Sequence, residues 1–360
     1  MGQNILITGA AGYIGGSILA DFISRTTSLI KAVNISAAVR TEEQAKSLSK
    51  LGVNVVQVNL KDETAVREAV LGNEIDIIVH TASSSDSSLA SHLINSLGQR
   101  RKVSGEQTYF IHSSITTLFS EEGGWPYGEV RDTDPIFEKE KEIEGPHPVR
   151  QTNILVTEQS KAQGVTSFNV VVPMVCMLPQ NNGRGSGGWR KLSVNIPASI
   201  RASIAQKVVY RFDKDGSPPA AHISDLTALY ALLVEKILQK ESMPSGENGH
   251  YFAMAHRAPW WDVMQRLADA LYAHELVKEP KVQTWPSDDI AADTLGFPRP
   301  FIRGIGVSSG QLVPVNAYRL GWQPQWDKER FLESMDDEVQ AVLELDTVKP
   351  TLFSSMLANN

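Results

Sequence analysis

The chain has 360 residues, of which 42% are hydrophobic and 21% charged, as is typical of a globular protein with a large core. Its net charge of −7 does not favour nucleic acid as a partner, and its single cysteine, Cys176, excludes an intrachain disulfide. No uninterrupted apolar stretch is long enough to span a membrane, and the first predicted strand begins almost at Met1, which leaves no room for a signal peptide. We therefore expect a cytoplasmic protein.

The first half of the chain alternates short apolar runs with amphipathic segments, which predicts a doubly wound parallel sheet of the α/β class. The predicted strands span residues 5–8, 35–39, 53–58, 75–80, 108–112 and 167–172. The predicted helices between them span residues 12–24, 42–50, 63–70, 87–97 and 153–163.

The first predicted strand ends in a glycine-rich turn, Gly9-Ala10-Ala11-Gly12-Tyr13-Ile14-Gly15, which leads into the first helix. Gly9 can adopt the positive φ of a sharp turn, and Gly15 lets the helix approach the strand. A side chain at Gly12 would block a pyrophosphate, which the first-turn amides would otherwise face at the positive end of the helix dipole. The turn is therefore predicted to bind a dinucleotide, together with Ala11, Tyr13 and Ile14.

Residues 120–149 interrupt the alternation with glycines, prolines and acidic residues, including the charge run 138–144. We favour a solvated loop for this segment, and a lid over the site is the alternative. After Pro173 the pattern becomes mostly helical. Helices are predicted at 194–205, 225–238, 260–272 and 327–345, and a strand at 207–212.

The end of the second predicted strand bears on the choice of dinucleotide. Enzymes that prefer NAD usually place a carboxylate there, whereas this chain has Arg40, and Glu42 lies too far into the next helix. An arginine can pair with the 2′-phosphate of NADP. We therefore predict NADP(H), with NAD less favoured, and a solvated strand-end charge is the alternative role of Arg40.

Further motifs follow at the ends of later strands. They are Asn59-Leu60 before Asp62, His80-Thr81-Ala82-Ser83, Val171-Val172-Pro173 and His222-Ile223-Ser224-Asp225-Leu226. With the glycine turn, they resemble the extended and atypical members of the short-chain dehydrogenase/reductase superfamily, most closely fungal NAD-dependent epimerase/dehydratase-like proteins. The resemblance implies a Rossmann-type sheet, a helix cap at Asp225, and cofactor contacts from Asn59, Leu60, Thr81, Ala82, Ser83, Ser113, Pro173 and Val175.

Two regions are expected from this resemblance and from the change of pattern after Pro173. Residues 1–175, with roughly 207–240, should form the NADP-binding Rossmann domain. Residues 176–206 and 241–360 should form a smaller, mostly helical lobe that binds the substrate.

The residues that usually carry the superfamily's reductive chemistry are replaced. Its members use a serine or threonine, a tyrosine acid and a lysine that lowers the tyrosine pKa. With Glu158 aligned to the glutamate of the family's helix, Arg150 stands at the tyrosine position and Ile154 at the lysine position. Ile115 stands at the serine position, directly after Ser113-Ser114.

Other side chains are therefore candidates for the chemistry. Arg150 cannot act as an acid at neutral pH, but it can hold an oxyanion or a substrate carboxylate. His147 can exchange a proton near neutrality, and Ser114 and Thr116 can hydrogen-bond a substrate carbonyl. Structural roles are the alternatives, with Arg150 in a helix-start ion pair and His147 in a loop.

Two literal motifs elsewhere receive little weight. Tyr210 and Lys214 have the Tyr-x-x-x-Lys spacing but fall on a predicted strand and its turn, and Gly183–Gly188 lacks a strand–turn–helix frame. Trp189, Trp260 and Trp261 favour a pocket for a small molecule, although core packing is the commoner role of tryptophan.

The most favoured function is an NADP(H)-dependent oxidoreductase that reduces a carbonyl or enone of a small, natural-product-like substrate of secondary metabolism. The alternatives are a redox-neutral isomerase, dehydratase or cyclase, and a non-catalytic NADP sensor. We expect a small-molecule substrate as partner, with a second copy of the chain as a further candidate, and no metal, nucleic acid or membrane.

Overall fold

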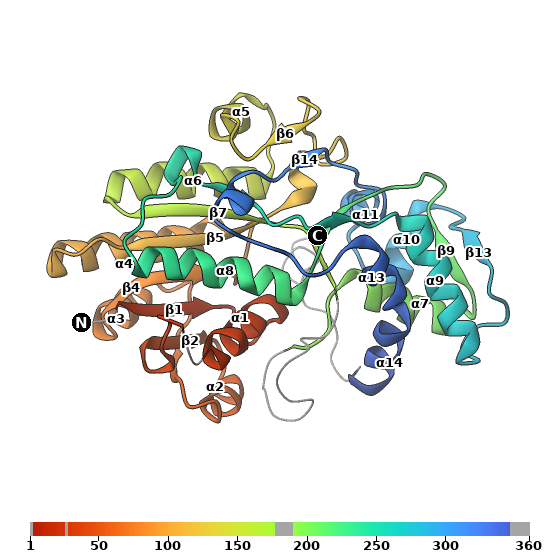
Figure 1. The fold of residues 1–360 in the computed structure, drawn as a ribbon, viewed down its shortest axis with the longest axis horizontal. Coiled ribbons are helices and arrows are strands. Elements are labelled where there is room, and N and C mark those ends of the chain that lie inside the picture. The colour runs from red at the N-terminus through yellow and green to blue at the C-terminus, as the bar shows by residue number, and fades with distance from the viewer. Residues whose placement is uncertain (1–2, 26–27, 177–189, 346–360) are drawn as a thin grey trace.

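A seven-stranded sheet forms the centre of the computed structural model, which describes residues 3–25, 28–176 and 190–345 (Figure 1). All its strand pairs are parallel, and the order is β11-β7-β5-β4-β1-β2-β3. The strands are β1 (Asn4–Thr8), β2 (Ile35–Val39), β3 (Asn54–Gln57), β4 (Ile75–His80), β5 (Tyr109–Ile115), β7 (Thr166–Val172) and β11 (His250–Phe252). The strand order reverses direction between β1 and β4, where ligands bind in open α/β sheets. The predicted doubly wound α/β fold is therefore confirmed.

Helices bury both faces of this sheet, as a parallel sheet requires. One face packs against α1 (Tyr13–Ser24) and α8 (Ile223–Leu238). The other packs against α3 (Glu63–Gly72), α4 (Ser87–Ser104) and α6 (Pro148–Gln163), and α2 (Glu42–Ser49) joins β2 to β3. The helix expected from residue 153 begins at Pro148 instead, because proline is well suited to the first helical position.

The segment between β5 and α6 is a packed unit and not the solvated loop that we favoured. Its short strand β6 (Val130–Arg131) pairs with β14 (Leu312–Val313), and α5 (Ile136–Glu142) packs against α6. The prediction was wrong because scattered apolar residues of this segment meet partners from distant parts of the chain. The cluster contains Leu118, Phe119, Trp125, Val130, Ile136, Val149, Val171, Phe252 and Leu312.

A second lobe lies beyond the carboxyl ends of the large sheet, at the right in Figure 1. Its core is formed by α7 (Asn195–Gln206), α9 (Trp260–Ala273) and α14 (Met335–Leu345). The helix expected over 327–345 is interrupted at Ser334, which separates α13 (Lys328–Glu333) from α14. The remaining helices are α10 (Asp288–Leu295), α11 (Ile302–Gly306) and α12 (Asn316–Arg319).

One small sheet lies where the lobe meets the rest of the molecule, and another lies within the lobe. The strands β8 (Met174–Cys176), β10 (Pro219–His222) and β12 (His256–Arg257) form one sheet, and β9 (Val209–Arg211) pairs with β13 (Val282–Thr284). Segments of the two predicted regions are interleaved, because β11 comes from the C-terminal part but closes the edge of the large sheet. The proposed division at 207–240 and 241–360 stays a prediction.

Asp225, in the first turn of α8, binds the loop at residues 325–326. Its carboxylate accepts hydrogen bonds from the backbone N–H groups of Gln325 and Trp326, at 2.9 and 3.0 Å. The capping residue of α8 is His222, whose Nδ1 accepts from the N–H of Ser224. The cap that the resemblance implied for Asp225 is therefore wrong, because its carboxylate binds a distant loop.

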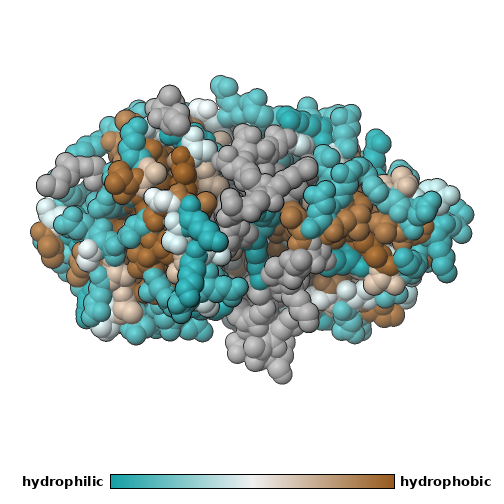
Figure 2. Space-filling view, turned by 90° about the horizontal axis from the view of Figure 1, so that it is seen from below, coloured by the Kyte–Doolittle hydropathy of each residue, from teal (hydrophilic) through white to brown (hydrophobic). Residues whose placement is uncertain are grey.

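The surface seen from below carries apolar patches on both halves and a hydrophilic rim (Figure 2). Within the described ranges, no helix combines the length and the apolar character that crossing a membrane requires.

Candidate functional site

The glycine turn has the backbone geometry that the sequence predicts. Gly9 has a φ of +70°, and its carbonyl accepts the N–H of Gly12 at 2.8 Å. A Cβ on Gly15 would lie 2.4 Å from the Gly9 oxygen and 2.5 Å from Oγ1 of Thr81. Gly9 and Gly15 are therefore required by the packing of the protein itself.

Gly12 differs from these two glycines. A Cβ there would meet only the Gly9 oxygen, at 3.1 Å, among described atoms outside the adjacent residues. Among the described residues, the space in front of Gly12 is therefore open for an anion at the start of α1. Ala11, Tyr13 and Ile14 are half-buried around it, and the carbonyl of Ala11 accepts the N–H of Arg190 at 3.1 Å.

The end of β4 holds the glycine turn in place. The Thr81 hydroxyl donates to the Thr8 carbonyl at 2.6 Å, and the Thr8 hydroxyl is hydrogen-bonded to Nδ1 of His80 at 2.8 Å. Oγ of Ser83 accepts from the backbone of Asp86 at 3.0 Å, while Ala82 is exposed. The motif therefore supports the turn, and its proposed contact with the cofactor stays a prediction.

Arg40 is exposed directly after β2, and none of the described residues forms an ion pair with it. Its backbone N–H donates to Oε1 of Gln44 at 3.0 Å, within the capping box that begins α2 at Thr41. Asn59 and Leu60 follow β3, where the Leu60 carbonyl is hydrogen-bonded to Nδ1 of His92. The guanidinium is therefore available to a phosphate at this edge.

The residues expected near the nicotinamide lie at the ends of β5 and β7. Ser113 shares a hydrogen bond of 2.6 Å with the Tyr230 hydroxyl on α8. Pro173 is buried, and Val175 is half-buried in β8, paired with Ala221 of β10. The hydroxyl of Ser113 is thus used within the protein, while the cofactor contacts of all three residues stay predictions.

Arg150 lies in the first turn of α6 with a side chain that is almost completely enclosed. The residue is 4% exposed, its Nε has no hydrogen-bond partner, and no described residue forms an ion pair with it. The helix-start ion pair considered for Arg150 is therefore not formed in the described part of the chain. The loop at Gly124 lies close by, since a Cβ there would be 3.7 Å from Nη2 of Arg150.

Three ionisable groups surround Arg150. Burial and the charge of Arg150 lower the pKa of His147, so this residue is neutral at pH 7 and its buried Nδ1 has no partner. Tyr127 and Glu140 both interact electrostatically with the guanidinium. Tyr127 is exposed and its hydroxyl donates to Glu142 at 2.9 Å, whereas Glu140 is 1% exposed.

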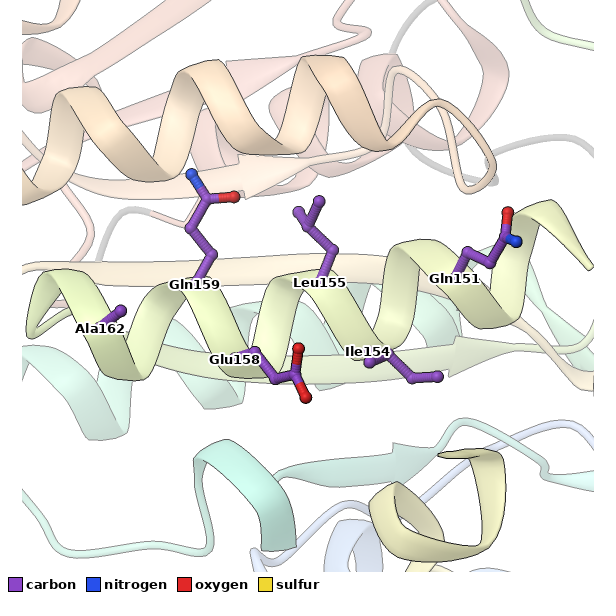
Figure 3. Close-up of a pocket in the computed structure, with 6 residues that line it drawn as sticks. All are labelled: Gln151, Ile154, Leu155, Glu158, Gln159 and Ala162. Carbon is purple, nitrogen blue, oxygen red and sulfur yellow. The ribbon is translucent and has the colours of Figure 1, made fainter. Parts of the chain in front are cut away.

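Ser114 is buried near the end of β5, and Thr116 is buried directly after that strand. Oγ of Ser114 has no hydrogen-bond partner, and Thr116 begins a short 3-10 turn, η2 (Thr116–Phe119). Ile154, at the expected lysine position, lies on the outer surface of α6. It lines a shallow hollow with Gln151, Leu155, Glu158, Gln159 and Ala162 (Figure 3).

Glu140 and its partners were missed by the sequence reasoning. Oε1 of Glu140 accepts from Nδ2 of Asn153 at 2.8 Å, and Oε2 lies 4.0 Å from Nε2 of His250. Burial raises the pKa of Glu140 to about 8 and lowers that of His250 to about 4. The spacing of Arg150 and Asn153 on one helix face was a signal, but nothing local links them to Glu140 or His250.

A row of polar residues crosses the sheet toward Glu140. His80, His112, Asn169 and His250 are register partners on β4, β5, β7 and β11. The His80 and His112 rings stack at 5.7 Å between centroids, and both nitrogens of His112 are buried without a hydrogen bond. The row connects the glycine turn, through Thr8 and His80, with the surroundings of Arg150.

Of the two literal motifs, one is not carried by a helix and the other lies outside the described residues. Tyr210 lies in β9 and stacks on Trp285, and Lys214 forms an ion pair with Glu122 at 3.6 Å. Tyr210 and Lys214 therefore do not share a helix face. Gly183–Gly188 and Trp189 fall outside the described residues. Trp260 is buried in the lobe core and not in a surface pocket, and Trp261 stacks under Arg211.

Comparison with known proteins agrees with this geometry. Residues 5–105 match the model of the NAD dependent epimerase/dehydratase family. Sterol-4-alpha-carboxylate 3-dehydrogenase (decarboxylating) of Dictyostelium discoideum is 32% identical over 80 residues. That match spans 22% of this chain and 22% of the relative, about a fifth of each.

Solved structures resemble nearly the whole chain. L-threonine dehydrogenase from Phytophthora infestans superposes with a TM-score of 0.61 at 16% identity, covering 94% of this chain and 99% of that one. UDP-glucose 4-epimerase from Thermus thermophilus, in complex with NAD, gives a TM-score of 0.59 at 15% identity, covering 94% and 99%. These likenesses extend the shared fold into the second lobe. The chain is thus similar to the NAD dependent epimerase/dehydratase family over residues 5–105, where the glycine turn heads α1, and it shares the fold of these solved structures over nearly its whole length.

Proposed function

We propose that the protein is an NADP(H)-dependent enzyme that reduces a carbonyl or enone group of a small substrate, with Arg150 holding negative charge on that substrate. The observation that carries this proposal is the enclosed guanidinium of Arg150, which has no ion-pair partner in the described chain. An uncompensated buried charge is costly, so a site that keeps one is suited to bind an anion.

Bound NADPH would supply a hydride to the substrate carbon. Arg150 would stabilise the negative charge that develops on the substrate oxygen, or hold a neighbouring carboxylate, without giving up a proton. The neutral ring of His147, or a water, would exchange the proton. Arg40 supports the preference for NADP(H), since its guanidinium is exposed and unpaired among described residues.

A substrate with a carboxylate beside the reacting carbon fits this site best. A guanidinium binds a carboxylate through two parallel hydrogen bonds. The name of the relative from Dictyostelium discoideum, a sterol-4-alpha-carboxylate dehydrogenase, describes a substrate of that kind.

A redox-neutral isomerase, dehydratase or cyclase is the second candidate. It is favoured by the absence of the usual tyrosine and lysine, because Arg150 can stabilise an enolate without any acid on the same helix. We also propose, on the sequence alone, that the protein forms a homodimer.

Native mass spectrometry of the purified protein, followed by calorimetric titration with NADPH and NADH, tests the proposal. We expect copurified or tightly binding NADP(H), and net oxidation of NADPH when β-keto acids are added. Conversion of a substrate with no net change in NADPH would support the redox-neutral candidate. Failure to bind either dinucleotide would overturn both.

A further inference from the structure

Glu140 is a buried acid that the proposed chemistry does not use. It comes from α5, in the packed segment between β5 and α6, and its side chain turns inward while its helix neighbours Glu138 and Glu142 are exposed. One carboxyl oxygen accepts from Nδ2 of Asn153 at 2.8 Å. The other is buried without a hydrogen-bond partner.

The groups that face Glu140 come from the elements packed around α5. On α6 they are Arg150 and Asn153, and from β11 comes His250, whose Nε2 is 4.0 Å from Oε2 of Glu140. His147 lies within the field of Arg150, and His112 lies two strands away from His250 in the row that crosses the sheet. The pairs Lys141–Glu158 and Lys161–Glu247, the latter from the short turn η3 (Gly246–Asn248), lie at the solvent-exposed rim.

Burial opposes the ionised form of Glu140, whereas the hydrogen bond from Asn153 and the positive charge of Arg150 both favour it. His250 gives no such support, because burial keeps its ring neutral near pH 7. An anion bound to Arg150 would neutralise the positive charge that favours ionisation of Glu140. The substrate carboxylate and the Glu140 carboxylate therefore depend on the same positive charge.

We propose that Glu140 controls the anion site at Arg150 through its own protonation. The neutral carboxyl leaves the charge of Arg150 to the carboxylate of a substrate, and the ionised carboxylate competes with it. This inference rests on the proposed role of Arg150. A pKa near 8 for Glu140 places the change at the alkaline edge of the physiological range.

Two consequences follow from linkage. Binding of a carboxylate at Arg150 above about pH 8 is accompanied by uptake of a proton, and affinity falls as the pH rises through that region. Glu140→Gln fixes the neutral state, because the amide oxygen still accepts from Asn153 and no charge can form. Its affinity for a carboxylate is then independent of pH over the same range.

Infrared spectroscopy with ¹³C-labelled glutamate tests the protonation directly, without any ligand. We expect a carboxylic acid band at pH 7 that disappears with a midpoint near pH 8 and is missing in Glu140→Gln. In Arg150→Gln the midpoint rises by about one pH unit or more, because the favourable charge is gone. Glu138→Gln, an exposed position on the same helix, is the matched control and leaves the band unchanged.

Calorimetric titration of the NADP⁺-loaded protein, which has no hydride to transfer, with acetoacetate and with its neutral methyl ester tests the competition. We expect acetoacetate affinity to fall about fivefold to tenfold between pH 7 and pH 9 in the wild type. Glu140→Gln should show no such fall, and the ester should show none in either protein.

An ionised Glu140 at pH 7, or the same pH dependence in wild type and Glu140→Gln, would overturn the inference. If turnover still required Arg150 in that case, the proposed function would hold although the role of Glu140 would not. Failure of acetoacetate to bind at any pH would overturn the anion site itself, and with it this inference.

Discussion

The glycine turn and the surroundings of Arg150 differ in what holds them together. The turn is a backbone structure, in which Gly9 and Gly15 are fixed by contacts with one neighbouring strand end, at Thr81. Arg150 is surrounded by side chains from α5, α6 and the loop at Gly124, and β11 adds His250 beyond Glu140. The first region lies within the match to the epimerase/dehydratase family model, whereas the second lacks the tyrosine and lysine that the resemblance implies.

This difference reflects what each region has to supply. A dinucleotide phosphate is bound by main-chain amides at a helix start, which tolerate few substitutions at the glycines. Charge stabilisation at a substrate can be supplied by various side chains, provided that the surroundings support their ionisation state. The enclosed Arg150 and the buried Glu140 are one such arrangement, and the predictions below test both regions.

The largest effect is expected at Gly12. Gly12→Val should abolish dinucleotide binding, weakening it about a thousandfold or more, on the order of 4 kcal/mol, because the side chain fills the open space before α1. The protein should still fold, with a thermal midpoint near that of the wild type. Gly15→Ala is the contrasting variant, and it should lower stability by about 1–3 kcal/mol, since its Cβ would overlap the Gly9 oxygen. A folded Gly12→Val protein with normal NADPH affinity would show that the site is elsewhere.

The second prediction concerns the departure from the family pattern. Arg150→Ala should reduce turnover about a hundredfold, a few kcal/mol, while NADPH affinity changes little. Tyr210→Phe and Lys214→Ala should keep normal activity, because the two residues lie in the lobe on β9 and the turn after it. Steady-state kinetics and calorimetry on the same preparations provide the measurement. Normal turnover in Arg150→Ala, with loss in Tyr210→Phe, would reverse the placement of the chemistry.

The difference between the glycine turn and the surroundings of Arg150 also explains which features could be predicted from the sequence. Strands such as Ile35–Val39 and Ile75–His80 are short, mostly apolar runs, and their bounds were predicted correctly. The contact of Thr81 with the glycine turn follows from the adjacency of β1 and β4. These features depend on local patterns and on the topology of the sheet.

The surroundings of Arg150 could not be predicted in this way. Glu140 stands in a charge run that is typical of a solvated surface, and only its packing against α6 shows that it is buried. His250 lies in a three-residue strand, too short for a period of two to be visible. The strands β6 and β14 are shorter still, so the packed segment was interpreted as a loop.

The third prediction concerns the choice between NADP(H) and NAD(H) at Arg40. Arg40→Asp should weaken NADPH binding by at least about 2–3 kcal/mol, because a charge-assisted pair with the 2′-phosphate becomes a repulsion. NADH binding should change much less. Thr41, which caps α2 next to this position, keeps the helix start intact in the variant. Calorimetric titration with both cofactors provides the test, and an equal loss for both would refute the role of Arg40.

The smallest effect is expected on stability, at Glu140. Burial raises the pKa of this acid in the folded protein from its ordinary value of 4.5 to about 8. The unfolded chain therefore ionises first as the pH rises, and the folded state loses stability between about pH 4.5 and pH 8. Glu140→Gln removes this loss. The free energy of unfolding of the variant should match that of the wild type near pH 4 and exceed it by on the order of 1–2 kcal/mol at pH 8, after discounting for relaxation around the buried group.

Urea denaturation at a series of pH values measures this difference in the free energy of unfolding, with Glu138→Gln as the exposed control. A difference that stays constant from pH 4 to pH 8 would mean that Glu140 is ionised in the folded protein, and its charge would then compensate Arg150 at all these pH values.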